Sequence, residues 1–209
     1  MTVALDYLLV GSPRSGTGYS SQVLNSLGVA TGHESVFRPS GACLGAITEL
    51  GIRADSSWLA APYLSEACLS GTKLVHIVRN PYAVVASLRH IKLLHSGSDC
   101  VYTKFAYQHV PSVLNIADPM ARALVFYTHW NRMITRYACT RFNVEGPAEA
   151  LAAALDIPCV KGDLFSNRTY NTRKSPSYCP VIAEDLAHLP RDIVEPFNEL
   201  VEEFGYSIE

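Results

Sequence analysis

GSPRSGTGYS, residues 11–20, directly follows the apolar run LDYLLV at 5–10. Residues 15–27 then carry apolar side chains at helical spacing. A strand, a tight glycine turn and the start of a helix bring free backbone N–H groups and the positive end of the helix dipole to one point. The sequence therefore predicts a strand–loop–helix unit that binds an anion.

The glycine spacing of this loop resembles a Walker A loop, but its chemistry differs. Gly11 and Gly16 are separated by four residues, as in that motif, while Thr17 and Gly18 stand where it has Lys and Ser/Thr. The cation lies inside the loop instead, as Arg14. This pattern indicates a phosphate loop altered for a donor other than a magnesium-bound triphosphate. An ordinary turn between a strand and a helix, without a function, is the alternative.

A second segment has the character of a phosphate site. Residues 73–78, KLVHIV, form a short apolar run typical of a buried parallel strand. It is followed by Arg79, and Pro81 opens a helix that contains Ser87, eight residues after Arg79. A guanidinium can bind a phosphate in a bidentate manner, and a hydroxyl completes the shell. The alternative is a surface ion-pair residue followed by a neutral helix residue.

Together these segments resemble the sulfotransferases that use 3′-phosphoadenosine 5′-phosphosulfate (PAPS). The run P-R-S-G-T at 13–17 is similar to their 5′-phosphosulfate loop, and Arg79 with Ser87 is similar to their 3′-phosphate grip. The resemblance implies a three-layer α/β fold of the P-loop NTPase-like kind, with a mainly parallel central sheet flanked by helices. It also implies transfer of a sulfuryl group from PAPS to a hydroxyl or amine, leaving 3′-phosphoadenosine 5′-phosphate.

The resemblance also assigns residues to the nucleotide. Those of the 5′-phosphosulfate loop are Ser12, Pro13, Arg14, Ser15, Gly16, Thr17, Gly18 and Tyr19. It assigns Arg79 and Ser87 to the 3′-phosphate. The polar stretch 166–174 corresponds to a late basic loop that closes over the nucleotide, with Arg173 and Lys174 as candidates, although a solvated basic turn explains these two equally well.

Three residues are candidates for the chemistry. Arg14 is placed to stabilise the charge that develops on the departing nucleotide. Glu34 and His33 follow the second expected strand, so in a parallel sheet they should lie at the same edge as the loop at 11–18. Glu34 is the expected base that takes the proton of the acceptor. His33 is the alternative base, or it orients Glu34. A structural reading is also open, in which Glu34 pairs with Arg38. The transferred group carries less charge than a terminal phosphate, so no metal is expected.

Other classes of function stay open. One is a P-loop kinase, which the absent Lys-Ser/Thr pair disfavours. Another is a nucleotide-binding protein that has lost its acceptor chemistry. The acceptor itself, whether a small molecule, a carbohydrate or a peptide, is selected by no motif in the sequence.

Composition limits the remaining classes. With 209 residues and a net charge of −2, the expectation is one domain spanning 1–209 and no nucleic-acid partner. No run approaches the roughly 18 apolar residues of a membrane-spanning helix, and no secretory leader pattern is seen, so a cytoplasmic protein is expected. The six cysteines are scattered, which favours free thiols over a metal site. Nothing predicts the oligomeric state.

The remaining elements are expected from periodicity and from turn residues. Strands are predicted at 5–10, about 29–31, 73–78 and 141–144. Helices are predicted at 41–50, 56–67, 81–94, 119–140, 147–155 and 190–204. Residues 97–113 are expected to form a loop or lid, and Trp58 is expected to lie in the core.

Overall fold

The computed structural model describes residues 4–66, 69–91, 93–95, 97–138, 140–158 and 179–208. These residues group into two compact units. The first contains the chain up to Val78 and the segment Met133–Arg173, and the second contains Arg79–Arg132 and the segment Lys174–Glu209. That the whole chain acts as one domain, 1–209, stays a prediction.

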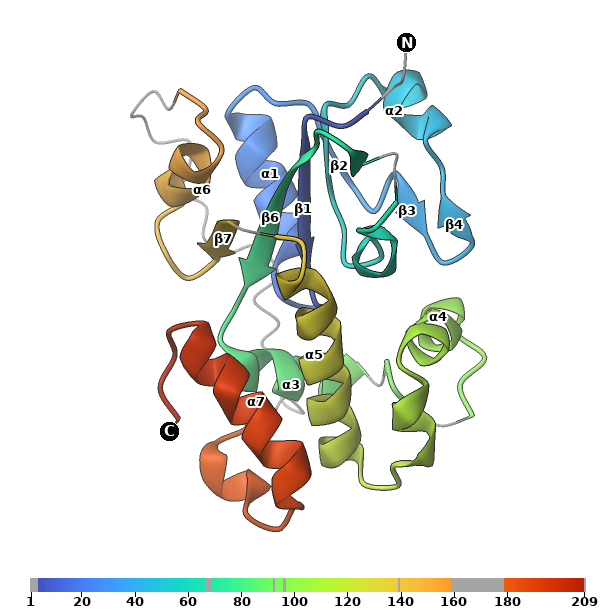
Figure 1. Ribbon diagram of the computed structural model, residues 1–209, viewed down its shortest axis with the longest axis vertical. Coiled ribbons are helices and arrows are strands. Elements are labelled where there is room, and N and C mark those ends of the chain that lie inside the picture. Colours follow the sequence, from blue (N-terminus) through green and yellow to red (C-terminus); the bar gives the residue numbers. More distant parts are fainter. Residues whose placement is uncertain are drawn as a thin grey trace. The chain divides into compact units, whose positions relative to one another are not determined.

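The first unit is built on a five-stranded sheet in which every neighbouring pair is parallel. In spatial order the strands are β2 (Thr31–His33), β5 (Ala54–Ser56), β1 (Tyr7–Gly11), β6 (Lys73–Val78) and β7 (Thr140–Asn143). Figure 1 shows β1 and β6 side by side, with α1 (Thr17–Ser26) beside them and α6 (Glu149–Ala154) next to β7. The α/β class with a parallel sheet flanked by helices is confirmed, as is the strand at 73–78.

Apolar side chains from the sheet and from both of these helices form one core. Leu9 on β1, Ile77 on β6 and Phe142 on β7 meet Leu24 of α1 and Leu151 of α6, and all five side chains are buried. Burying a side chain of this size stabilises the fold by roughly 1.5–3 kcal/mol. The helices are therefore fixed on the sheet, which gives the loops between strands and helices a rigid base.

The strand register aligns the carboxyl ends of the strands. Gly11 of β1 pairs with Ile77 of β6, and His33 of β2 pairs with Ser56 of β5. Parallel strands expose their carboxyl ends at one edge of the sheet, where ligands of open α/β folds bind. The loop after β1 and the turn after β2 therefore leave the sheet at the same edge.

The prediction of a helix at 56–67 is wrong. Residues Ala54–Ser56 form β5, which lies between β1 and β2, and only Ala61–Tyr63 adopt a short 3-10 helix, η1. All three residues of β5 are buried, although two of them are polar. Apolar alternation is therefore absent in β5, and the pattern gave no sign of a strand. Trp58 is buried, as expected.

Two further boundaries differ from the expectation. The helix expected at 41–50 begins later, as α2 (Gly45–Leu50), because Gly41–Ala42 form β4, which pairs antiparallel with β3 (Phe37–Arg38). The strand expected at about 29–31 is β2, at Thr31–His33, because the N–H of Val29 still donates to the carbonyl of Leu24 in α1.

The second unit is helical. Its elements are α3 (Pro81–Ile91), α4 (Val101–His109), η3 (Pro111–Asn115), most of α5 (Pro119–Thr135), η5 (Ala183–Leu186) and α7 (Arg191–Glu203). Two ring contacts tie its parts together, since Phe197 of α7 packs edge-on against Tyr82 of α3 and Tyr127 of α5. The helix expected at 119–140 ends earlier, because Thr140 starts β7.

The prediction of a loop or lid at 97–113 is also wrong, because α4 and η3 occupy most of this stretch. Phe105 of α4 packs edge-on against His109 and Trp130, with ring centroids 4.5 and 6.0 Å apart. The Thr103 hydroxyl donates to the carbonyl of Leu93 at 2.6 Å. Phe105 therefore packs inside the helical unit, whereas Tyr102 is exposed.

Neither a membrane-spanning helix nor a disulfide is seen in the described ranges. Within these ranges, no helix combines the length and apolar character needed to cross a membrane. Cys43, Cys100 and Cys179 are free thiols.

Candidate functional site

The loop after β1 is a closed turn with two left-handed residues. Both the backbone N–H and the hydroxyl of Ser15 donate to the carbonyl of Ser12, at 3.1 and 2.7 Å. Arg14 has φ 74° and Gly16 has φ 99°. A Cβ added at position 16 would lie 3.0 Å from Cγ1 of Val144, so only glycine suits this point of the loop. The loop is thus held in one shape.

This loop has the features of an anion site. The bonds of α1 begin where the N–H of Ser20 donates to the carbonyl of Gly16, so the N–H groups of the first turn point out of the helix end. No acidic residue lies in that turn. The hydroxyl of Ser12 is buried and, within the described ranges, has no hydrogen-bond partner. A buried polar group of this kind ordinarily has a partner, and an oxyanion in the loop would supply one.

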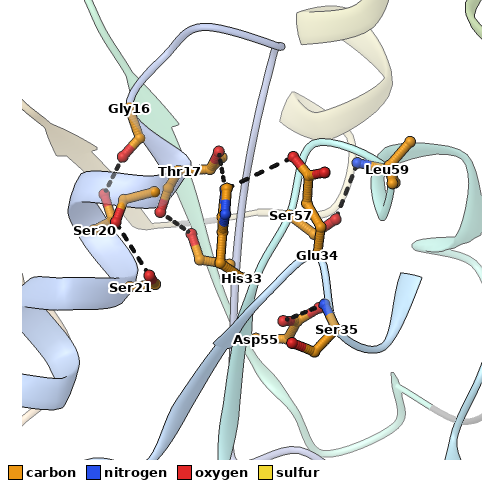
Figure 2. Close-up of polar contacts among 12 residues, drawn as sticks. Gly16, Thr17, Ser20, Ser21, His33, Glu34, Ser35, Asp55, Ser57 and Leu59 are labelled. Atoms are coloured by element: carbon orange, nitrogen blue, oxygen red, sulfur yellow. Dashed lines mark hydrogen bonds and ion pairs between the residues drawn. The ribbon is translucent and has the colours of Figure 1, made fainter. Parts of the chain in front are cut away.

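The turn after β2 brings His33 and Glu34 to this loop (Figure 2). Nε2 of His33 lies 3.2 Å from Oγ1 of Thr17, the first residue of α1. The same Nε2 lies 3.7 Å from Oε1 of Glu34. Thr17, His33 and Glu34, which the sequence predicted to share one edge of the sheet, therefore form a connected polar cluster.

Glu34 is held in an unusual conformation in a partly buried position. Its φ is 54°, and its N–H donates to the carbonyl of Ser56 at 3.2 Å. Burial raises the pKa of the Glu34 carboxyl, and a hydrogen bond from the Trp58 side chain opposes this effect. A carboxylate whose pKa is raised toward neutrality is a better proton acceptor near neutral pH. In the part of the chain described, the basic side chain nearest its carboxylate is that of His33, and the pairing with Arg38 is not observed.

His33 is favoured in its neutral form. Burial lowers the pKa of its imidazole, and the nearby Asp55 carboxylate opposes that shift. A neutral imidazole donates from one nitrogen and accepts at the other, so its contact with Thr17 is compatible with either direction of donation. His33 can thus keep its contact with Thr17 without carrying a charge.

Sequence reasoning missed β5, the strand that supports this cluster. The hydroxyl of Ser56 donates to the carbonyl of Thr17 at 2.8 Å. The carboxylate of Asp55 accepts the N–H groups of Ser35 and Val36, each at 3.2 Å. The sequence holds no strand signal here, because the polar run Asp55-Ser56-Ser57 lacks the apolar alternation of a half-buried strand.

The residues expected at the 3′-phosphate belong to the second unit. Arg79 directly follows β6, and Ser87 is a buried residue of α3, so both occupy the local positions that the sequence predicted. Arg173 and Lys174 lie outside the described residues, so their expected role stays a prediction. Within the described ranges, no three His, Cys, Asp or Glu side chains are grouped as metal ligands would be.

Comparisons with solved structures identify the fold. The sulfotransferase domain from the curacin biosynthetic pathway matches with a TM-score of 0.59 and 12% identity, over 100% of both chains. The sulfotransferase domain from the Synechococcus PCC 7002 olefin synthase matches with a TM-score of 0.56 and 14% identity, over 100% of this chain and 98% of that one. No family model and no curated protein matches the sequence. The chain therefore has the sulfotransferase fold.

Proposed function

We propose that this protein transfers a sulfuryl group from PAPS to a hydroxyl or amine of a small-molecule, carbohydrate or peptide acceptor. The observation that carries the proposal is the contact between Thr17 and His33. It joins a glycine loop suited to an oxyanion with a turn that carries a partly buried carboxylate, Glu34. Sulfuryl transfer needs both an anion cradle and a proton acceptor beside it.

The loop residues 12–19 would hold the 5′-phosphosulfate. The buried Ser12 hydroxyl and the N–H groups of Thr17 and Gly18 offer donors to its oxygens. PAPS supplies a sulfuryl group on a good leaving group, so the protein needs mainly to position it and to stabilise charge. Arg14 lies within the loop and would meet the negative charge that grows on the departing phosphate oxygen.

Glu34 would accept the proton that the acceptor loses during attack on sulfur. Its raised pKa supports this role, because the carboxylate then has more driving force to take a proton. His33, lying 3.7 Å from Glu34, would orient the carboxylate while itself neutral. The proton would thus be held on Oε1 or Oε2 of Glu34 when the product leaves.

Ligand-dependent thermal unfolding, followed by a transfer assay, tests the function. PAPS should raise the unfolding temperature, whereas ATP with magnesium should not, because only a ligand of the folded state stabilises it by mass action. Labelled sulfate should then move from PAPS to at least one member of a panel of phenols, alcohols, amines, sugars and tyrosine peptides. Stabilisation by ATP with magnesium alone would favour a kinase, and stabilisation by PAPS without transfer to any acceptor would favour a binding protein.

Arg79→Ala should weaken binding of PAPS by about 10- to 100-fold, the loss expected for one charge-assisted bidentate contact. Adenosine 5′-phosphosulfate lacks the 3′-phosphate, so its binding should barely change. Calorimetry with both nucleotides measures the difference. Ser87→Ala should act in the same direction more weakly, because it removes one neutral donor.

Arg89→Ala is the matched control for this experiment. Arg89 is an exposed arginine on α3, the helix that also carries Ser87, so its loss changes the net charge by the same amount. The control should leave both affinities unchanged. Equal weakening of both nucleotides by Arg79→Ala would remove Arg79 from the 3′-phosphate site.

A further inference from the structure

We propose that Asp55 is a positioning residue that holds the turn carrying Glu34 in the geometry a base requires. The inference rests on the proposed function of Glu34. Asp55 belongs to β5, and its side chain is fully buried. Figure 2 shows its carboxylate against Ser35, in the turn that carries Glu34 and His33.

The carboxylate uses both of its oxygens on this turn. Oδ1 accepts the N–H of Ser35 and Oδ2 accepts the N–H of Val36, each at 3.2 Å. The N–H of Glu34 donates to the carbonyl of Ser56, also in β5, at 3.2 Å. Three successive N–H groups, those of residues 34, 35 and 36, are therefore bound by β5. Two of these three bonds depend on the Asp55 side chain.

The turn needs such support because Glu34 is left-handed. With φ 54°, Glu34 occupies a backbone region that is unfavourable for residues with a side chain, and such conformations persist only where the surroundings fix them. Release of Ser35 and Val36 would allow Glu34 to return to an ordinary conformation. Its carboxylate would then move away from His33 and from the loop at Thr17.

The carboxylate lies close against the backbone of β2. A Cβ added at Gly32 would lie 2.8 Å from Oδ1 of Asp55 and 2.6 Å from the hydroxyl of Ser35. The backbone of β2 therefore touches the Asp55–Ser35 pair immediately before His33. Glycine at this position allows the close approach of β2 to β5.

The chemistry of the contact requires aspartate. Both N–H groups need an acceptor, and an ionised carboxylate offers an acceptor on each oxygen with no competing donor. Burial raises the pKa of Asp55, while the N–H groups of Ser35, Val36 and Phe37 and the nearby His33 oppose the shift. Asparagine would place its NH2 group against one of the two N–H donors, so one bond would be lost.

Asp55→Asn should therefore lower kcat by about 10- to 100-fold, the range that a misplaced catalytic group produces. The dissociation constant for PAPS should change by less than about twofold, because the loop at 12–19 keeps its own contacts. In a Glu34→Gln background the same change should lower kcat by less than about twofold more, because it acts through Glu34. Rate losses that multiply fully in the double variant would overturn the proposal.

Ser57→Ala is the matched control. Ser57 is buried and directly follows the same strand, and its hydroxyl accepts the N–H of Leu59 at 3.1 Å, so this change also takes a side-chain acceptor from a backbone N–H. It leaves the Glu34 turn alone and should leave kcat within about twofold of the wild-type value. A loss as large as that of Asp55→Asn would show that any disturbance of β5 has the same effect, and would overturn the specific role.

Backbone amide exchange separates this inference from the proposed function. The amides of Ser35 and Val36 should be protected in the wild-type chain and should exchange faster in Asp55→Asn. Unprotected wild-type amides, or unchanged exchange in the variant, would overturn the inference whatever the activity. A wild-type chain that transfers no sulfate, but shows the protection, would overturn the proposed function alone. If Asp55→Asn does not fold, Gly32→Ala pushes on the same contact and should give the same split between kcat and PAPS affinity.

Discussion

Glu34→Gln should slow sulfuryl transfer by about 10²–10⁴-fold, the contribution expected of a general base. The change keeps the shape of the side chain, but replaces one acceptor oxygen by an NH2 donor and removes the ability to take a proton. The dissociation constant for PAPS, measured by calorimetry, should stay near the wild-type value, because Glu34 lies outside the loop at 12–19. Single-turnover transfer of labelled sulfate measures the chemical step directly.

The pH dependence of kcat gives an independent reading of the same residue. A base acts only when deprotonated, so the rate should fall as the pH falls through the pKa of Glu34. Burial raises that pKa, and this acid limb should therefore lie above the range of an ordinary glutamate. The limb should be absent in Glu34→Gln. A limb that persists in this variant would belong to another group.

One control and one comparison complete the experiment. The control, Glu49→Gln, removes an exposed carboxylate on α2 and should leave the rate unchanged. His33→Ala should reduce the rate less than Glu34→Gln, since the imidazole orients the carboxylate. If Glu34→Gln transfers sulfate at the wild-type rate and His33→Ala does not, the base is His33.

The part of the fold that the sequence predicted is the part with strong local signals. The apolar runs at 5–10 and 73–78 became β1 and β6, and the glycine turn at 11–18 became the loop before α1. These elements can be predicted because their signals are local: an apolar run marks each strand, and Gly16 and Pro81 mark the starts of helices. The expectation that His33 and Glu34 lie near the loop followed from the parallel sheet and was confirmed by the contact with Thr17.

The part that could not be predicted depends on contacts between distant residues. β5 consists of Ala54, Asp55 and Ser56, whose strand conformation is fixed by pairing with β1 and β2 rather than by propensity. Helix α4 lies between Gly97 and Pro111, which mark turns, and its helical packing depends on Trp130. Asp55 could not be connected with Glu34 for the same reason.

Arg14→Ala should lower kcat by about 10²–10³-fold, as expected when a donor to developing negative charge is removed. The affinity for PAPS should fall much less, because the charge that Arg14 meets grows in the transition state. Arg14→Lys should retain partial activity, since a lysine supplies the same charge without the planar geometry of the guanidinium. Turnover at saturating PAPS, with affinity measured separately, distinguishes these effects.

The left-handed backbone at position 14 allows variants to separate the effect of the charge from the effect of backbone strain. Arg14 has φ 74°, a conformation in which alanine and lysine carry the same strain as arginine. The difference between Arg14→Ala and Arg14→Lys therefore reports the cation alone. Arg14→Gly removes both the cation and the strain, and it should be as slow as Arg14→Ala if the charge matters. Normal turnover in Arg14→Gly would mean that the loop needs only its shape, and normal turnover in Arg14→Ala would exclude Arg14 from the chemical step.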